Sequence, residues 1–160
     1  MKAAAARVQT ALRALGLSSE VQELTDSART AAEAAQACGV EVGQIVKSLV
    51  FVAGGEPILV LVSGGNQADE GRLRALTGQP VRRADAELVR SATGFAIGGV
   101  PPVGHPRPLR TIVDRDLLGY ERLIAAAGTP HAVFPLTPAE LVRITGAEVA
   151  DVARRGLACA

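Results

Sequence analysis

Two apolar runs rich in β-branched residues lie on either side of a short glycine turn, and this pair limits the possible folds more than any other feature. The runs cover residues 45–53 (IVKSLVFVA) and 57–62 (PILVLV), and Gly54, Gly55 and Glu56 join them. Two such runs joined by a short loop containing glycine are typical of a β-hairpin. The sequence therefore predicts a hairpin near the middle of the chain.

Helix and strand signals alternate along the rest of the chain. Amphipathic spacing and capping residues predict helices over residues 4–15, 30–38, 69–76 and 85–92 and from Thr137 onward. Further extended segments are predicted over residues 20–24, 80–83, 110–113, 122–127 and 131–136. Several strands follow one another directly, which favours a mixed sheet in an α/β (mixed α+β) fold over a regular βαβ winding. No linker interrupts the 160 residues, so we expect a single domain over residues 1–160.

Composition excludes several classes of protein. The longest unbroken apolar runs are five residues long, as at 49–53 and 58–62, far short of the roughly 18 that a membrane helix needs. The alanine-rich N-terminal segment is interrupted by arginines and does not resemble a signal peptide, so we expect a cytoplasmic protein. Cys38 and Cys159 lack the spacing of a metal or redox site, and we interpret both as small apolar fillers.

The charge of the chain gives little information about its partners. A formal net charge of +1 produces no strong global field that would attract nucleic acid. A local basic patch remains open if the fold brings together Arg82, Arg83, Arg107, Arg110 and Arg115. Three phenylalanines and one tyrosine are too few for a platform that stacks successive bases. We expect neither DNA nor a membrane as a partner.

Lys47 is the most informative single residue. Strand alternation places it on the same face as Ile45, Leu49 and Phe51. Such a lysine can lie near a strand end and reach water, or it can protect a strand edge from pairing. However, all of the 17 basic residues except Lys2 and Lys47 are arginine. A compact ammonium that can lose its proton differs from a planar guanidinium that stays charged, so a lysine at this position also suggests a functional site.

The second candidate feature is the glycine and proline loop AIGGVPPVGHP at residues 96–106. Pro101 and Pro102 stiffen its centre, and the glycines at both ends let a ligand come close. The only ionisable side chain of this loop belongs to His105, so its main-chain N–H groups are the candidates to bind a carbonyl or phosphate oxygen. A plain crossover loop explains the prolines equally well. His105 is either a proton donor, a substrate contact or a surface residue.

Other motifs give weaker signals. Residues 63–66 (SGGN) follow a strand as a phosphate-binding turn would, but they lack the spacing of the known phosphate loops, and a hairpin exit explains them equally well. Asp114 and Asp116 suggest paired carboxylates, although alternation on a strand is the commoner origin of this pattern. His105 and His131 have no metal-ligand spacing, and no nucleophile elbow is present. We therefore expect neither a metalloenzyme nor a serine hydrolase.

Four motifs, in this order along the chain, resemble the YbaK/EbsC family, which is related to the editing domain of bacterial prolyl-tRNA synthetases. They are VKSLVF, GFAIGGVPPVGH, TIVDRD and LTPAELVRITGAEVADV, and the resemblance covers about residues 8–153. It implies a barrel-like mixed sheet wrapped by helices. It also implies a freestanding aminoacyl-tRNA deacylase that hydrolyses mischarged tRNA in trans without a metal or a cofactor.

The resemblance assigns roles to residues of both candidate features. The essential lysine of the family corresponds to Lys47, as the catalytic residue. The G-x-x-x-P loop of the family predicts substrate binding by Gly98, Gly99, Val100, Pro101 and Pro102, with Gly104 and His105 as further candidates. The run PPVGH departs from the family pattern, in which a serine or another small residue often precedes the final proline.

The chemistry that the resemblance implies agrees with these residues. An aminoacyl ester is already activated, so the protein needs only to position a water molecule or a substrate group and to stabilise an oxyanion. The loop N–H groups would bind the oxyanion. Lys47 is either a cation for the phosphate and the carbonyl or a base of lowered pKa. The sequence shows no second cation near Lys47, which favours the first role.

The expected substrates are small misattached amino acids, because exclusion by size discriminates best against larger residues. Cys, Ala, Ser or Thr on tRNA-Pro or a related tRNA are the candidates, and an aminoacyl-tRNA synthetase is a candidate partner. The alternative is a non-catalytic module that binds a tRNA acceptor end, a nucleotide or an amino acid.

Overall fold

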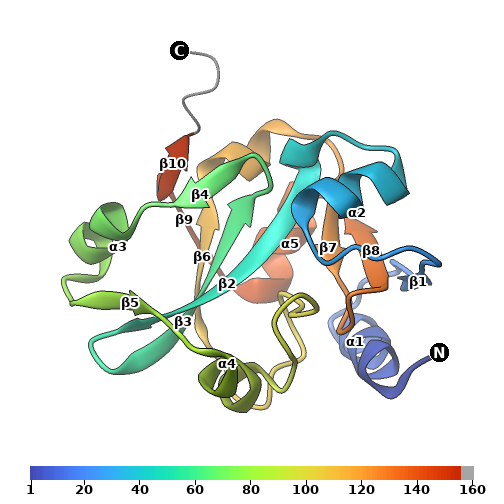
Figure 1. The fold of residues 1–160 in the computed structure, drawn as a ribbon, viewed down its shortest axis with the longest axis horizontal. Helices are drawn as coiled ribbons and strands as arrows, with labels where there is room; N and C mark the ends of the chain where they lie inside the picture. The colour runs from blue at the N-terminus through green and yellow to red at the C-terminus, as the bar shows by residue number, and fades with distance from the viewer. Residues whose placement is uncertain (156–160) are drawn as a thin grey trace.

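A mixed β-sheet with helices around it forms the body of the molecule in the computed structural model, which describes residues 1–155 (Figure 1). The helices are α1 (Ala3–Ala14), α2 (Ala31–Cys38), α3 (Glu70–Thr77), α4 (Ala86–Thr93) and α5 (Pro138–Thr145), with short 3-10 helices η1 (Val42–Gln44) and η2 (Arg115–Gly119). The strands are β1 (Gln22–Glu23), β2 (Ile45–Ala53), β3 (Glu56–Ser63), β4 (Asn66–Ala68), β5 (Val81–Arg83), β6 (Arg110–Asp114), β7 (Leu123–Ala126), β8 (Ala132–Leu136), β9 (Glu148–Ala150) and β10 (Ala153–Arg155).

The sheet combines parallel and antiparallel pairs. Its order is β1-β8-β7-β2-β3-β6-β9, and β5 pairs with β2 in addition, while β4 and β10 form a separate two-stranded sheet. The β2–β7, β3–β6 and β6–β9 pairs are parallel, and the other pairs are antiparallel. The predicted mixed sheet flanked by helices is confirmed. Of the helices in the described residues, none is long and apolar enough to cross a membrane.

The predicted hairpin is the centre of this sheet. Strands β2 and β3 pair without interruption from Val46 opposite Ser63 to Ala53 opposite Glu56. Gly54 and Gly55 both have positive φ angles, which the tight turn between the strands requires.

The helices begin and end where the sequence places their capping residues. The side chains of Thr30, Asp69, Asp85 and Thr137 each accept a hydrogen bond from a main-chain N–H in the first turn of a helix. Helices α2 to α5 each end at a glycine in the left-handed conformation. The capping signals therefore gave these boundaries correctly.

The edge of β2 that does not face β3 pairs with two different strands, and a gap without strand pairing in the described residues lies between them. Strand β7 pairs with residues 45 and 46 of β2, and strand β5 pairs with residues 51–53. The N–H of Ala84 also donates to the carbonyl of Val50 at 3.1 Å. Between them, residues 47–49 of β2 have no partner strand on this side in the described part of the chain. Residues Lys47, Ser48 and Leu49 are also the partly exposed ones in an otherwise buried strand.

Both faces of the hairpin are packed with apolar side chains. On one face Val46, Val50, Leu59 and Leu61 belong to the main core, which α1, α4 and α5 also contribute to. On the other face Phe51, Val60 and their neighbours pack with residues of α3. A third cluster joins α2 to Ile45 at the start of β2. Because apolar side chains pack against both faces of the hairpin, the unpaired middle of β2 is held rigidly in position.

Strands β4, β9 and β10 were not predicted. Each has three residues, and their sequences NQA, EVA and ARR have no period of two that would identify a strand. They pair through contacts distant in sequence, such as Asn66 opposite Arg155. The predicted strands over residues 20–24, 80–83, 110–113, 122–127 and 131–136 are present, and the first is shortened to two residues.

Asp114 joins three segments at the end of β6. Its side chain is fully buried. Its Oδ2 accepts hydrogen bonds from the N–H of Ser63 at 3.0 Å and from the amide of Asn66 at 2.9 Å, and its Oδ1 accepts one from the N–H of Asp116 at 3.0 Å. One carboxylate therefore fixes the end of β3, the start of β4 and the start of η2.

Replacing Asp114 is expected to destabilise the fold strongly. Asp114→Ala leaves three donors without an acceptor, and each buried donor left unpaired costs about 1–3 kcal/mol, so we expect a loss of about 3–5 kcal/mol of unfolding free energy in urea titrations. Asp85→Ala is the control, because that exposed carboxylate caps only one helix and its loss costs about 1 kcal/mol. Equal losses in the two variants would contradict this role of Asp114.

Candidate functional site

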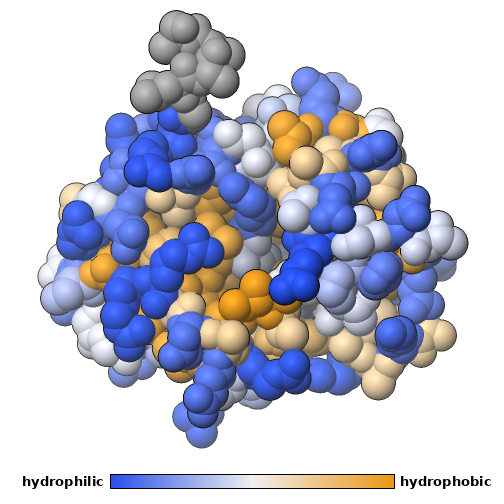
Figure 2. All heavy atoms as spheres, viewed as in Figure 1, coloured by the Kyte–Doolittle hydropathy of each residue, from blue (hydrophilic) through white to orange (hydrophobic). Residues whose placement is uncertain are grey.

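A cleft of about 450 Å³ opens where β5 and β7 diverge from β2. Its polar and glycine lining comes from the middle of β2, the segment before α2, the turn after β3, the end of β5 and the loop between α4 and β6, and residues of α2, α4, β7 and β8 add apolar walls. Most of the lining is apolar, including Ile45, Val50, Val89, Ile124 and Val133. Figure 2 shows a hollow near the middle of the face drawn in Figure 1, with hydrophobic residues beside it. The cleft thus combines an apolar wall with an exposed strand edge.

Lys47 lies in this cleft with its side chain half-buried. Its Nζ donates to the main-chain carbonyl of Asn66. Burial lowers the pKa of Lys47, the nearby charge of Arg83 lowers it further, and Asp114 opposes both effects. The expectation that no second cation lies near Lys47 is therefore wrong. Arg83 comes from β5, which the fold places beside β2 although it is distant in sequence.

The acceptor of Lys47 is held by a polar network. The side-chain amide of Asn66 donates to Asp114 at 2.9 Å and to Asp116 at 2.8 Å. Asp116 in turn binds the guanidinium of Arg155 through both carboxylate oxygens, at 3.0 and 3.1 Å. Those hydrogen bonds lower the pKa of Asp116 below its ordinary value, although desolvation opposes them. The carboxylates of Asp114 and Asp116, which the sequence suggested as a pair, therefore both accept from the side-chain amide of Asn66 and fix its position.

The glycine end of the loop reaches the cleft. Gly98 and Val100 line it together with Lys47. The loop is held in place by two main-chain hydrogen bonds of Gly99, whose N–H donates to Ala96 at 3.1 Å and whose carbonyl accepts from Gly128 at 2.8 Å. Within residues 1–155 the N–H groups of Gly98 and Val100 donate no hydrogen bond. Gly98 has a φ of 95°, a conformation in which a side chain would be strained.

The other loop residues proposed for substrate binding lie outside the cleft lining. Pro101 and Pro102 are buried, and Gly104 is exposed at a φ of 88°. The Nε2 of His105 lies 2.8 Å from the carbonyl oxygen of Pro101. Since a carbonyl only accepts, this nitrogen carries the proton, and burial lowers the pKa of the ring although that bond opposes the shift. His105 therefore stabilises the loop by a hydrogen bond to the main chain of the same loop.

Three residues of the cleft were not found by sequence reasoning. The Oγ of Ser48 is buried and has no hydrogen-bond partner among the described residues. Arg29 lies across the loop, because a Cβ built on Gly98 would be 3.0 Å from its Cγ. Arg83 stands over the ring of Phe51, with 5.5 Å between the guanidinium carbon and the ring centroid. A polar residue beside Lys47 on the strand was a signal for Ser48. Arg83 was considered only as a member of a possible basic patch, and Arg29 had no signal in the sequence.

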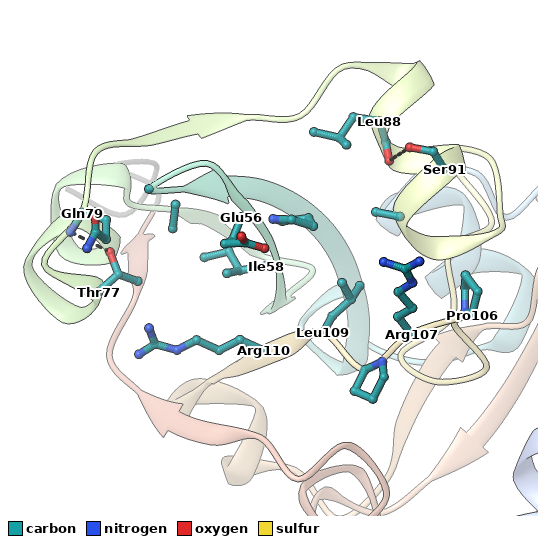
Figure 3. Close-up of a pocket in the computed structure, with 15 residues that line it drawn as sticks. Glu56, Ile58, Thr77, Gln79, Leu88, Ser91, Pro106, Arg107, Leu109 and Arg110 are labelled. Atoms are coloured by element: carbon teal, nitrogen blue, oxygen red, sulfur yellow. Dashed lines mark hydrogen bonds between the residues drawn. The ribbon is translucent and has the colours of Figure 1, made fainter.

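Two further cavities lie away from Lys47. The larger, about 850 Å³, lies between the hairpin turn, α4 and the segment after the loop, where Figure 3 shows Glu56, Arg107 and Arg110. Arg110 is paired with Glu148 at 3.2 Å. The other, about 660 Å³, contains Arg115. The arginines considered for one basic patch are thus divided: Arg83 lines the cleft, Arg107 and Arg110 line the larger of these cavities, Arg115 lines the other, and Arg82 lines none of the three. Neither of these two cavities contains Lys47 or the loop glycines.

Comparisons with known proteins agree with this geometry. A family model described as "Aminoacyl-tRNA editing domain" matches residues 25–144. The chain therefore belongs to the aminoacyl-tRNA editing domain family. The match includes both Lys47 and the loop.

Individual relatives extend this result. A crystal structure titled as that of "a putative trans-editing enzyme for prolyl tRNA synthetase" has a TM-score of 0.92 and 55% identity, and the match covers 98% of this chain and 99% of that one. The Enterococcus faecalis protein named "Putative Cys-tRNA(Pro)/Cys-tRNA(Cys) deacylase EbsC" is 25% identical over 77% of this chain and 76% of its own. A "Proline--tRNA ligase" of Nitratidesulfovibrio vulgaris (strain DP4) is 36% identical over 64% of this chain and 18% of its own. The membership in the YbaK/EbsC group that the motifs indicated is confirmed.

Gly99→Ala is expected to displace the loop. A Cβ at this position would lie 2.8 Å from main-chain atoms of Gly128 and Thr129, which cannot move independently, so we expect a loss of about 1–3 kcal/mol in urea unfolding. Gly119→Ala is the control, because nothing lies within 4 Å of its Cβ position and its φ is not in the left-handed region. A Gly99→Ala protein as stable as the control would show that this close approach does not constrain the loop.

The lowered pKa of Lys47 can be measured directly, because Lys2 is the only other lysine. In protein labelled with ¹³C-lysine, the Cε resonance of Lys47 should titrate below the ordinary lysine pKa. Arg83→Gln should raise that pKa, since it removes a nearby positive charge. Arg82→Gln is the control on the same strand, and Lys2→Arg assigns the other resonance. No rise in Arg83→Gln, or an equal rise in both variants, would contradict the assignment to Arg83.

Proposed function

We propose that the protein is a trans-editing deacylase that hydrolyses the ester between a small, misattached amino acid and the 3′ end of a tRNA. The observation that carries the proposal is that Lys47 lines one apolar cleft with Gly98 and Val100, whose N–H groups donate no hydrogen bond within residues 1–155. Membership in an aminoacyl-tRNA editing family supports it.

The loop and the lysine supply what ester hydrolysis requires. Water adds to the carbonyl carbon, and the carbonyl oxygen becomes an oxyanion. When this intermediate collapses, the C=O bond re-forms, the C–O bond to the ribose breaks, and the ribose oxygen takes a proton that came from the water, which leaves a free amino acid and a tRNA with a free 3′ end. In this proposal the N–H groups of Gly98 and Val100 bind the oxyanion, where fixed donors are most effective. Lys47 has three N–H donors and uses one on Asn66, so the others are free for the substrate. Its carbonyl contact holds the ammonium, which favours the cation role over the base role.

The strand edge offers partners for the amino acid. The carbonyl of Val50 faces β5, and alternation along β2 puts the main-chain N–H and carbonyl of Ser48 on the same side, where no strand pairs with it in the described residues. Together with the unpaired Oγ of Ser48, this gives a site for the α-ammonium group of the substrate. The surrounding walls are valine, isoleucine and alanine, which favour a small side chain.

The names of the relatives narrow the choice of tRNA. The crystal structure at 55% identity is that of "a putative trans-editing enzyme for prolyl tRNA synthetase", and the relative from N. vulgaris is named "Proline--tRNA ligase". We therefore propose Cys, Ala, Ser or Thr on tRNA-Pro or a related tRNA as the substrate, and prolyl-tRNA synthetase as a candidate partner.

Deacylation of a panel of aminoacyl-tRNAs tests the proposal. We expect turnover of one or two of the Cys-, Ala-, Ser- and Thr-charged species, and a fall in kcat/KM of roughly 100-fold or more in Lys47→Ala, as for loss of a group that stabilises an oxyanion. Lys2→Ala is the matched control. Lys47→Arg should restore little activity, since a planar fork cannot replace the compact ammonium in a site shaped around it.

The outcome that would contradict the proposal is equally specific. If the wild type hydrolyses none of these esters but still binds tRNA or a nucleotide, the cleft is a binding module without catalysis. An active Lys47→Ala protein would remove Lys47 from the mechanism.

A further inference from the structure

The cleft carries more positive charge than the proposed ester hydrolysis needs, because that reaction uses Lys47 but neither Arg29 nor Arg83. Arg29, Lys47 and Arg83 line it, and its lining contains no carboxylate among the described residues. Neither arginine forms an ion pair in residues 1–155, so both guanidinium groups are available to a ligand. Like charges gathered in one cleft repel each other, and the charge of Arg83 adds to the effect of burial in lowering the pKa of Lys47, so this cluster of three cations indicates an anionic ligand.

We propose that Arg29 and Arg83 bind the phosphodiester groups that precede the terminal nucleoside of the substrate, while Lys47 and the loop act on the ester. This inference rests on the proposed function, and it adds a phosphate-binding subsite to the reactive site. Guanidinium groups suit this role because their planar forks match phosphate oxygens in pairs.

Arg29 approaches from the segment before α2. It is exposed, and its side chain crosses Gly98, with its Cγ and Nε 3.0 and 3.4 Å from the position of a Cβ on that glycine. A phosphate held by Arg29 would therefore lie beside the loop that is proposed to bind the oxyanion. Since Gly98 has no side chain, the arginine stem packs directly on the main chain of the loop.

Arg83 approaches from the end of β5. It is exposed too, and its guanidinium stands 5.5 Å from the ring centroid of Phe51, which fixes its place beside β2. Its neighbour Arg82 is also exposed but does not line the cleft, as alternation along a strand requires. The chain thus presents one arginine of this pair to the cleft and the other elsewhere.

Phosphate contacts are the main means by which this cleft can hold RNA. Phe51, Phe95 and Phe134 are fully buried, and no aromatic ring lines the cleft in the described residues. Base stacking on aromatic rings, which many single-strand binders use, is therefore absent from this lining. The remaining interaction is with the charged backbone, which is independent of base sequence and sensitive to salt.

The test compares two substrates that share the ester and differ in phosphates. One is the 3′-aminoacyl ester of adenosine, which has no phosphate, and the other is the same amino acid on an RNA minihelix ending in CCA. We expect Arg29→Gln and Arg83→Gln each to lower kcat/KM for the minihelix by about 10- to 100-fold relative to the adenosine ester. Using the ratio of the two substrates cancels any change in the ester-cleaving step, including one through the pKa of Lys47.

Salt dependence gives a second readout. Each lost phosphate contact should reduce the slope of log kcat/KM against log salt by roughly 0.7 for the minihelix. The adenosine ester should show no such change. Arg82→Gln is the matched control, with the same loss of charge on the same strand, and it should leave the ratio and the slope unchanged.

The outcomes distinguish this inference from the proposed function. If both substrates are hydrolysed and the arginine variants alter neither ratio nor slope beyond the Arg82→Gln control, the phosphate subsite is refuted and the deacylase remains. Equal loss on both substrates would assign the arginines to the ester site and would also refute the inference. If neither ester is hydrolysed by the wild type, the proposed function fails, and the inference fails with it.

Discussion

The change of neighbours along β2 is the feature on which the rest of the structure depends. A central strand of a sheet normally pairs on both edges, and its main-chain N–H and carbonyl groups are then unavailable to a ligand. Here β7 takes the first residues of β2 and β5 takes the last, so that residues 47–49 keep one free edge inside the molecule. The cleft is this interruption, enclosed by α2 on one side and by the loop after α4 on the other.

Such an interruption is costly, and the polar network around Asp114 offsets part of the cost. Unpaired main-chain groups and a half-buried ammonium both lose hydration. The carbonyl of Asn66 gives the ammonium a partner, and Asn66 is itself fixed by Asp114 and Asp116. Apolar burial on both faces of the hairpin offsets the remaining cost, because these side chains are buried whether or not the cleft is occupied. The site is therefore built on a hairpin that is packed on both faces.

Local signals in the sequence predicted much of this arrangement. The hairpin, the capped helices and the mixed sheet follow from periodicity and from residues such as Thr137, and Lys47 was notable because arginine is otherwise preferred. Short edge strands such as β10 have too few residues to show a period. The loop shows why geometry was needed: Gly98 and Val100 line the cleft, whereas the adjacent prolines are buried and His105 binds its own loop. Arg83 lies near Lys47 only because β5 pairs with β2, and no local sequence pattern predicts that pairing.

The same arginine that binds phosphate in our proposal also depresses the pKa of Lys47, and this links substrate binding to the charge of the lysine. In the free cleft, burial and Arg83 both favour loss of the proton. A phosphate placed beside Arg83 neutralises its field, and its own negative charge favours the ammonium form. Binding and protonation therefore support each other, as linkage requires. A guanidinium at position 47 would stay charged throughout and would gain nothing from this coupling, whereas the pKa of a lysine there rises when a phosphate binds beside Arg83.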